Sequence, residues 1–143
     1  MADPLGGIRG PRLRPVEPFL STLGPSASGM SAFQKSLEAI SSNIANAETT
    51  RTPEGGAYKR QVVVMRPDGK GGVEVAQLVE DARPGRKEFI PGHPDADAEG
   101  MVSMPNVDLA TETVDLVIAR RMHEANVSVF QAAKAMLHQA LEI

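Results

Sequence analysis

The sequence of 143 residues contains no cysteine and no tryptophan, a single tyrosine and only 3% aromatic residues. Without cysteine, disulfides, thiolate zinc sites and a cysteine nucleophile are all excluded. So few aromatic rings argue against the stacking platforms that bind single-stranded nucleic acid and against aromatic cages for cations. A formal charge of -3 gives no basic surface for nucleic acid either. We therefore predict no nucleic-acid partner and no small-molecule substrate.

Long apolar runs are also missing. No stretch of the sequence approaches the roughly 18 apolar residues that a helix needs to cross a bilayer, so the chain is predicted not to span a membrane. Arg9, Arg12 and Arg14 precede a short apolar stretch, but Glu17 and Pro18 interrupt that stretch. A cleaved secretory signal peptide is therefore not predicted.

Proline and glycine are concentrated at the start of the chain, with five prolines and four glycines in the first 27 residues. A segment of this composition is a poor helix former and has little to bury. We therefore predict a disordered extension over residues 1–25. The first helix is predicted to begin just after it, with Ser26 or Ser28 as its N-cap.

The sequence does contain matching apolar patterns at its two ends. Apolar residues recur at alternating steps of three and four between residues 30 and 47, and a similar rhythm runs from residue 116 to residue 140. Such spacing predicts helices with a coiled-coil-like seam. The C-terminal helix carries a second apolar row beside the first, so it needs at least two partners. The predicted assembly residues on these rows are Met30, Phe33, Leu37, Ile40, Ile44, Leu116, Ile118, Met122, Asn126, Val129, Phe130, Met136 and Leu137.

Two asparagines, Asn43 and Asn46, interrupt the first helix three residues apart. Asparagine is a mediocre helix former, so the pair needs an explanation. One account is that the helix frays here into a loop, with Asn46 near its C-cap. The account that we favour is that both amides form hydrogen bonds across a helix–helix contact and fix its register, as buried asparagines do in coiled coils. Both residues are therefore added to the predicted assembly interface.

The middle of the chain is predicted to form β structure. The segment from Tyr58 to Met65 is rich in β-branched residues, residues 67–72 form a turn, and residues 73–79 alternate in part, which predicts a hairpin. Short extended pieces follow at 87–90 and 100–104. The last helix is predicted to start near Pro105, with Asn106 or Asp108 as its cap and an acidic residue in its first turn.

This pattern predicts a mainly α fold with a small β insertion. Its terminal helices pair as a coiled-coil-like core. The predicted units are a helix and loop over residues 26–57, a β-rich region over 58–104 and a helix over 105–143.

No catalytic, cofactor or metal site is predicted. His93, Asp95, Asp97 and Glu99 alternate within one segment, but a calcium loop in this register lacks the final bidentate glutamate, so a hydrogen-bonded turn is the better interpretation. His123 lies on an apolar row, so we predict that it packs within the protein rather than binding a ligand. No serine, histidine and aspartate are grouped as a nucleophile with its base, so we predict that the protein is not an enzyme.

Several motifs resemble one protein family. Residues 28–32 (SGMSA) followed by residues 42–50 (SNIANAETT) resemble the N-terminal signature of bacterial flagellar axial proteins of the rod, hook and filament type. Residues 50–56 with Tyr58, residues 91–100 (PGHPDADAEG) and residues 104–107 (MPNV) narrow the resemblance to basal-body rod proteins. The segments 124–127, 132–135 and 140–143 are also similar to the end of such a protein. The resemblance covers about residues 26–143, so the extension before it is additional.

The resemblance implies a structural subunit of the proximal rod, the drive shaft that crosses the cell envelope. The terminal helices would form the inner layer of a helical tube, and the β-rich middle would lie outside. Implied partners are copies of the same chain, other rod proteins, the adaptor at the base of the rod and the flagellar type III export apparatus. The implied location is the periplasmic part of the basal body, reached without a cleaved signal. A soluble helical adaptor or export chaperone is the alternative, although it leaves the central strands without a role.

Overall fold

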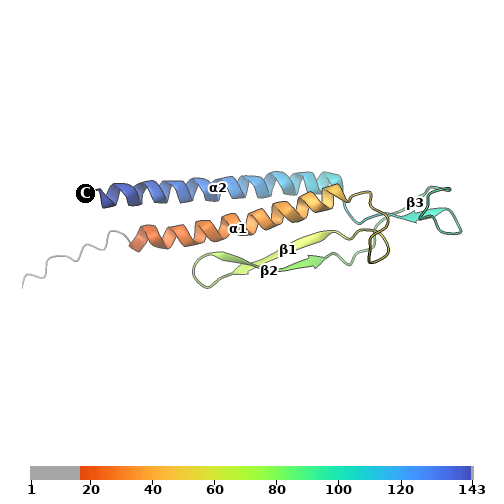
Figure 1. Cartoon of the computed structure of the whole chain (residues 1–143), viewed down its shortest axis with the longest axis horizontal. Coiled ribbons are helices and arrows are strands. Elements are labelled where there is room, and N and C mark those ends of the chain that lie inside the picture. The colour runs from red at the N-terminus through yellow and green to blue at the C-terminus, as the bar shows by residue number, and fades with distance from the viewer. Residues whose placement is uncertain (1–16, 143) are drawn as a thin grey trace, which may run out of the picture.

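The structure is a computed structural model that describes residues 17–142, with side chains from residue 20 onward. It is elongated and built from two long antiparallel helices with a β-hairpin beside them (Figure 1). The predicted class, mainly α with a small β insertion, is therefore confirmed. No helix in this described part is long and apolar enough to span a membrane.

The first helix, α1, spans Glu17–Ala45 and begins earlier than the sequence predicted. The prediction that helix starts only after Ser26 or Ser28 was wrong. These two serines lie inside the helix, where their hydroxyls donate to the carbonyls of Thr22 and Pro25. Pro25 also lies inside α1 and lacks an N–H for the helix ladder, an arrangement that ordinarily costs about 3 kcal/mol. The predicted extension thus loses residues 17–25 to helix, and residues 1–16 lie outside the described part.

The second helix, α2, spans Leu109–Leu141 and starts as the sequence indicated. Asp108 is its N-cap, and its carboxylate accepts hydrogen bonds from the backbone of Ala110 and the hydroxyl of Thr111. Asn106, the other predicted cap, has a different role. Its side chain accepts from the backbone N–H of Arg60 and donates to the carbonyls of Asp81 and Arg83, which ties the loops together before α2.

The predicted hairpin is confirmed. Strands β1 (Gln61–Pro67) and β2 (Val73–Glu80) pair in antiparallel register, with an irregularity between Val64 and Met65. The hairpin lies along α1 on the side away from α2, so α1 is the middle of three layers (Figure 1). Strands β3 (Lys87–Phe89) and β4 (Met101–Ser103) form a separate two-stranded sheet at the far end.

The buried residues are mostly small. Alanines at α1 positions 32 and 39 and at α2 positions 119 and 133 are at most 6% exposed. Ala32 lies toward the hairpin, where it lines a hollow with residues 73–75. Where α1 meets α2, small residues let the two helices approach closely. At Gly29, an added β-carbon would lie 2.8 Å from the side-chain amide of Asn126 on α2. The buried side chains are therefore divided between the two helices and the segment from Val102 to Val107, and most of the large apolar side chains are left at or near the surface.

Candidate functional site

The two apolar rows predicted on α2 have different environments. The row of Leu116, Ala119, His123, Asn126 and Phe130 is buried or half-buried, and it continues to Ala140. The contact of Asn126 with Gly29 shows that this row faces α1. His123 is half-buried within it, as expected of a packing residue. One of the two partners that α2 needs is therefore α1 of the same chain.

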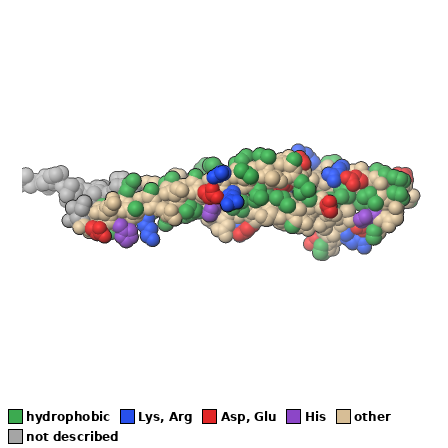
Figure 2. All heavy atoms as spheres, turned by 90° about the horizontal axis from the view of Figure 1, so that it is seen from above, with side chains coloured by type: hydrophobic (Ala, Val, Ile, Leu, Met, Phe, Trp, Pro, Cys, Tyr) green, Lys and Arg blue, Asp and Glu red, His purple; other side chains and the backbone are tan. Residues whose placement is uncertain are grey.

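The second row of α2 has no partner within the described residues. Ile118, Met122, Val129 and Met136 are 46% to 54% exposed, and the alanines between them are exposed too. Hydrophobic side chains run along the length of the molecule among charged ones in Figure 2. A row of apolar residues at coiled-coil spacing, left in water over more than four turns, is typical of a helix that contacts another protein.

This row borders a groove between α2, α1 and the hairpin. One hollow of about 160 Å³ lies between Phe33 and Ile40 of α1, Val62 and Val63 of β1 and Ile118 of α2. A second, of about 510 Å³, lies further along α2 and includes Met122, Val129 and Phe33. Phe33 thus contributes to both hollows. The groove and the exposed row together form the candidate site, which is an apolar docking surface.

The predicted apolar residues of α1 are partly or fully covered within the chain. Ile40 is buried, and the other apolar members of the row are half-buried, so none of them is fully free for a second protein. Those half-buried members are Met30, Phe33, Leu37 and Ile44. On α2, the same intermediate burial applies to Leu116, Asn126, Phe130 and Leu137. Whether these residues also contact neighbouring molecules stays a prediction.

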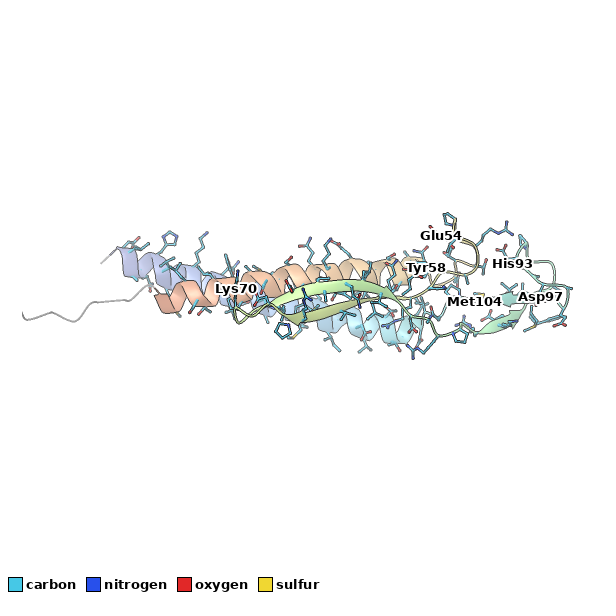
Figure 3. All side chains as sticks on the ribbon, turned by 90° about the horizontal axis from the view of Figure 1, so that it is seen from below. Glu54, Tyr58, Lys70, His93, Asp97 and Met104 are labelled. Carbon is cyan, nitrogen blue, oxygen red and sulfur yellow. The ribbon has the colours of Figure 1, made fainter. Side chains whose placement is uncertain are left out.

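Asn43 lies at the centre of a buried polar cluster. Its side chain is fully buried, and its amide group donates to the carboxylate of Glu112 on α2 at 3.0 Å and to the carbonyl of Gln61 at 2.9 Å. Its side-chain oxygen accepts from the backbone N–H of Gln61 at 2.8 Å and from the hydroxyl of Tyr58 at 3.0 Å. Figure 3 shows Tyr58 near the end of α1. The expected hydrogen bond across a helix–helix contact is therefore present at Asn43.

Asn46 behaves differently. Its amide donates back to the carbonyl of Ser42 at 2.9 Å, and its oxygen accepts from the hydroxyl of Thr49 at 3.1 Å. Both bonds stay within the last turn of α1 and the turn that follows it. Within this chain, Asn46 therefore matches the first hypothesis, in which the asparagine lies where the helix ends. Only Asn43 matches the second hypothesis, in which the amide forms a hydrogen bond across the helix–helix contact.

Glu112 is the partner that the sequence did not reveal. Its carboxylate is fully buried and accepts from the Arg60 guanidinium as well as from Asn43. Arg60 in turn pairs with Asp115 at 3.0 Å. The sequence placed an acidic residue in the first turn of α2 only for its effect on the helix dipole. Residues 43, 60 and 112 are far apart in the chain, so no local pattern identifies the cluster. We call Asn43, Arg60 and Glu112 the polar cluster.

The acidic segment near residues 93–99 is a hydrogen-bonded turn, as predicted. The Asp95 carboxylate accepts from the hydroxyl of Thr50 at 2.7 Å and pairs with Arg51, and these contacts lower its pKa. The Asp97 carboxylate accepts from the backbone of Glu99 and Met101. His93 and Asp97 lie at the end of the molecule that is distant from the hairpin turn carrying Lys70 (Figure 3). The described residues contain no group of three or more residues arranged to hold a metal ion.

Asp81 is expected to keep its charge to a lower pH than an ordinary aspartate does. The Arg83 guanidinium and backbone N–H, which both donate to its carboxylate, lower the pKa of Asp81 to about 2. Because this pKa is lower in the folded chain, the ionised group stabilises the fold above about pH 4 and loses that contribution as the pH falls toward 2. A carboxyl-detected NMR titration measures the pKa directly. Arg83→Gln should return it toward 3.8, whereas Arg86→Gln, which removes a partner of Glu88, should leave it unchanged. A pKa near 3.8 in the unmodified chain would contradict the prediction.

Comparison with known families finds matches at both ends of the chain. Residues 26–51 match the family described as flagella basal body rod protein. Residues 98–143 match the family described as flagellar basal body rod FlgEFG protein C-terminal. These two segments contain the second half of α1 and all of α2, so the family signatures cover much of the paired helices.

Individual relatives match along most of the chain. The chain is 38% identical to a Yersinia enterocolitica protein and 36% identical to a Borreliella burgdorferi protein, with 87% of this chain and 97% of each relative covered. It is 36% identical to a Bacillus subtilis protein, with 85% of this chain and 95% of the relative covered. All three relatives carry the description flagellar basal-body rod protein FlgC.

Proposed function

We propose, given that the chain belongs to the FlgC family of flagellar basal-body rod proteins, that it joins the rod through the exposed row of α2. Membership in this family makes the chain a structural subunit of the flagellar basal body that assembles with other rod proteins. A soluble adaptor or chaperone, the alternative considered from the sequence, has no support among these relatives. The proposal concerns the surface that carries assembly.

The observation that carries this proposal is the unpartnered apolar row of Ile118, Met122, Val129 and Met136. Full burial of a large apolar side chain stabilises a contact by roughly 1.5–3 kcal/mol. These four side chains are already about half-buried, so covering them supplies on the order of 3–6 kcal/mol before the entropic cost of association is subtracted. In a rod, each subunit repeats its contacts with several neighbours, so moderate individual affinities suffice.

The partner that packs on the exposed row is a helix of a neighbouring rod subunit. That subunit is either a second copy of this chain or another rod protein. The spacing of the row matches helix-in-groove packing, in which a partner helix lays its apolar face between two walls. Here α2 and the hairpin provide the walls, and α1 provides the floor with Phe33. The remaining predicted seam residues would border the same contact from within the subunit.

The family also suggests where the subunit is located in the cell and how it is delivered there. We place the subunit in the periplasmic part of the basal body, delivered by the flagellar export apparatus without a cleaved signal, with the adaptor at the rod base among its neighbours. The distal β3–β4 sheet would then lie away from the helical layer. The names of the relatives support a place in the basal-body rod. The sequence resemblance supports the export route, the periplasmic location and the adaptor at the rod base.

Photo-cross-linking in isolated basal bodies tests the assembly surface. A photoreactive amino acid at Val129, on the exposed row, is expected to give covalent adducts with a second copy or with another rod protein. The matched control is Gln131, which is exposed on the polar side of the same helix. Adducts at position 131 but none at position 129, in strains that swim normally, would contradict the proposed surface.

A further inference from the structure

The contact between α1 and α2 repeats every seven residues. Gly29, Ser36 and Asn43 on α1 follow one another at heptad intervals, and Asn126, Ala119 and Glu112 on α2 follow at the same interval. Gly29 meets Asn126, Ser36 lines a hollow with Ala119, and Asn43 meets Glu112. Sliding one helix along the other by one heptad, about 10 Å, again places small or polar residues opposite one another along this row. Packing along this row therefore distinguishes weakly between the observed register and a slipped one.

The contact between Gly29 and Asn126 does not prevent such a slip. Gly29 faces Asn126, whose side-chain atoms fill the space where a β-carbon would be. A shift of one heptad in either direction brings Ala119 or Ala133 to that position. Alanine is smaller than asparagine, so the slipped arrangement meets no steric barrier at Gly29. Two contacts between the helices, Gly29–Asn126 and Asn43–Glu112, lie two heptads apart on both helices and are therefore consistent with a single register.

The polar cluster does distinguish between the registers. The Glu112 carboxylate is fully buried and depends on Asn43 and Arg60 for its hydrogen bonds. Arg60 lies beside the end of α1, because both backbone groups of its neighbour Gln61 form hydrogen bonds with the Asn43 side chain, and its own backbone N–H donates to Asn106. A slip of one heptad moves the carboxylate about 10 Å away from both partners. An unpartnered buried charge is strongly unfavourable, so slipped registers are excluded.

We propose that the polar cluster is a register lock, which selects one of several heptad-related pairings of α1 and α2. The lock sets the position of the exposed row of α2 relative to α1 and the hairpin. In a slipped subunit this row would be displaced along the molecule by about 10 Å. The inference concerns the pairing of helices within one chain, so its test is independent of the proposed assembly surface.

Distance measurement by pulsed electron paramagnetic resonance tests the lock on the full chain. Because the chain has no cysteine, Gln34→Cys and Gln131→Cys provide two unique attachment sites for nitroxide labels. Both positions are exposed, one on each helix. The chain with an intact polar cluster is expected to give a single narrow distance. In a Glu112→Met background, a second discrete distance should appear, displaced by several Å, as a heptad slip requires.

Methionine is chosen because it is unbranched, apolar and compatible with burial in a helix, so the fold should persist without the charge. Arg60→Met removes the opposite charge and should give the same second distance, which provides a second test if the first variant fails to fold. Asp115→Asn is the matched control. It removes the other partner of Arg60 but leaves the contact between Asn43 and Glu112, so the single original distance should remain.

Two results would overturn the register lock. A single unchanged distance in folded Glu112→Met and Arg60→Met chains would show that packing alone sets the register. A broad, continuous distribution in both variants would show that the helices separate rather than slip. The lock is supported only by discrete second populations that the two variants share and that Asp115→Asn lacks.

Discussion

Met122→Glu is expected to abolish motility while leaving the subunit folded. Met122 is 46% exposed on the second row of α2, and glutamate is a good helix former, so the free subunit should lose little stability. In the rod, the same side chain would be covered by a neighbouring helix. An unpartnered charge in such a contact costs about 3–5 kcal/mol. Repeated in every subunit, that cost should prevent incorporation into the rod.

Swimming assays and imaging of isolated basal bodies measure the result. The strain should carry the variant in place of the original chain, and thermal unfolding should show that the purified variant remains folded. Gln131→Glu is the matched control because it places the same charge on the polar side of α2, where motility should be retained. A motile Met122→Glu strain with normal basal bodies would show that the exposed row is not an assembly surface.

Asn43→Ala is expected to lower the free energy of unfolding by about 3 kcal/mol or more, because each buried polar group left without a partner costs about 1–3 kcal/mol. The side chain is fully buried and supplies hydrogen bonds to Glu112, to Tyr58 and to both backbone groups of Gln61. Alanine leaves several of these groups unsatisfied at once. Equilibrium unfolding in urea measures the change.

The comparison with Asn46→Ala makes this prediction specific. Asn46 belongs to the same motif and the same helix end, but its hydrogen bonds reach only Ser42 and Thr49. Its replacement should cost about 1 kcal/mol or less, the value of one or two partly exposed hydrogen bonds. Equal losses for the two variants would mean that Asn43 contributes through local helix geometry rather than through contacts with α2 and β1.

The positions of the secondary-structure elements were largely predictable from the sequence. Alternating steps of three and four predicted both helices, and the β-branched run before the turn at residues 67–72 predicted the hairpin. Asp108 was predicted as a cap because its side chain can satisfy backbone donors close to it in sequence. These signals are local, since each depends on residues within a few turns or within one hairpin.

The start of α1 was not predictable in the same way. Proline and glycine before residue 26 argue against helix by local propensity, yet α1 includes Gly24 and Pro25. Part of the explanation is tertiary. The helix continues alongside the hairpin turn, where Ser28 accepts a hydrogen bond from the backbone N–H of Val73. Packing against other elements commonly overrides an unfavourable propensity of this size.

The sequence by itself determined that this protein has two amphipathic terminal helices, a β-rich middle and the motifs of a flagellar rod subunit. Periodicity and short motifs encode these features locally. The tertiary structure alone decided which of the two rows of α2 meets α1 and which remains exposed, because both rows are apolar and equally well spaced. It also decided that Asn43, Arg60 and Glu112 meet. A buried charge selects its partners by distance in space, and that distance exists only after the chain has folded.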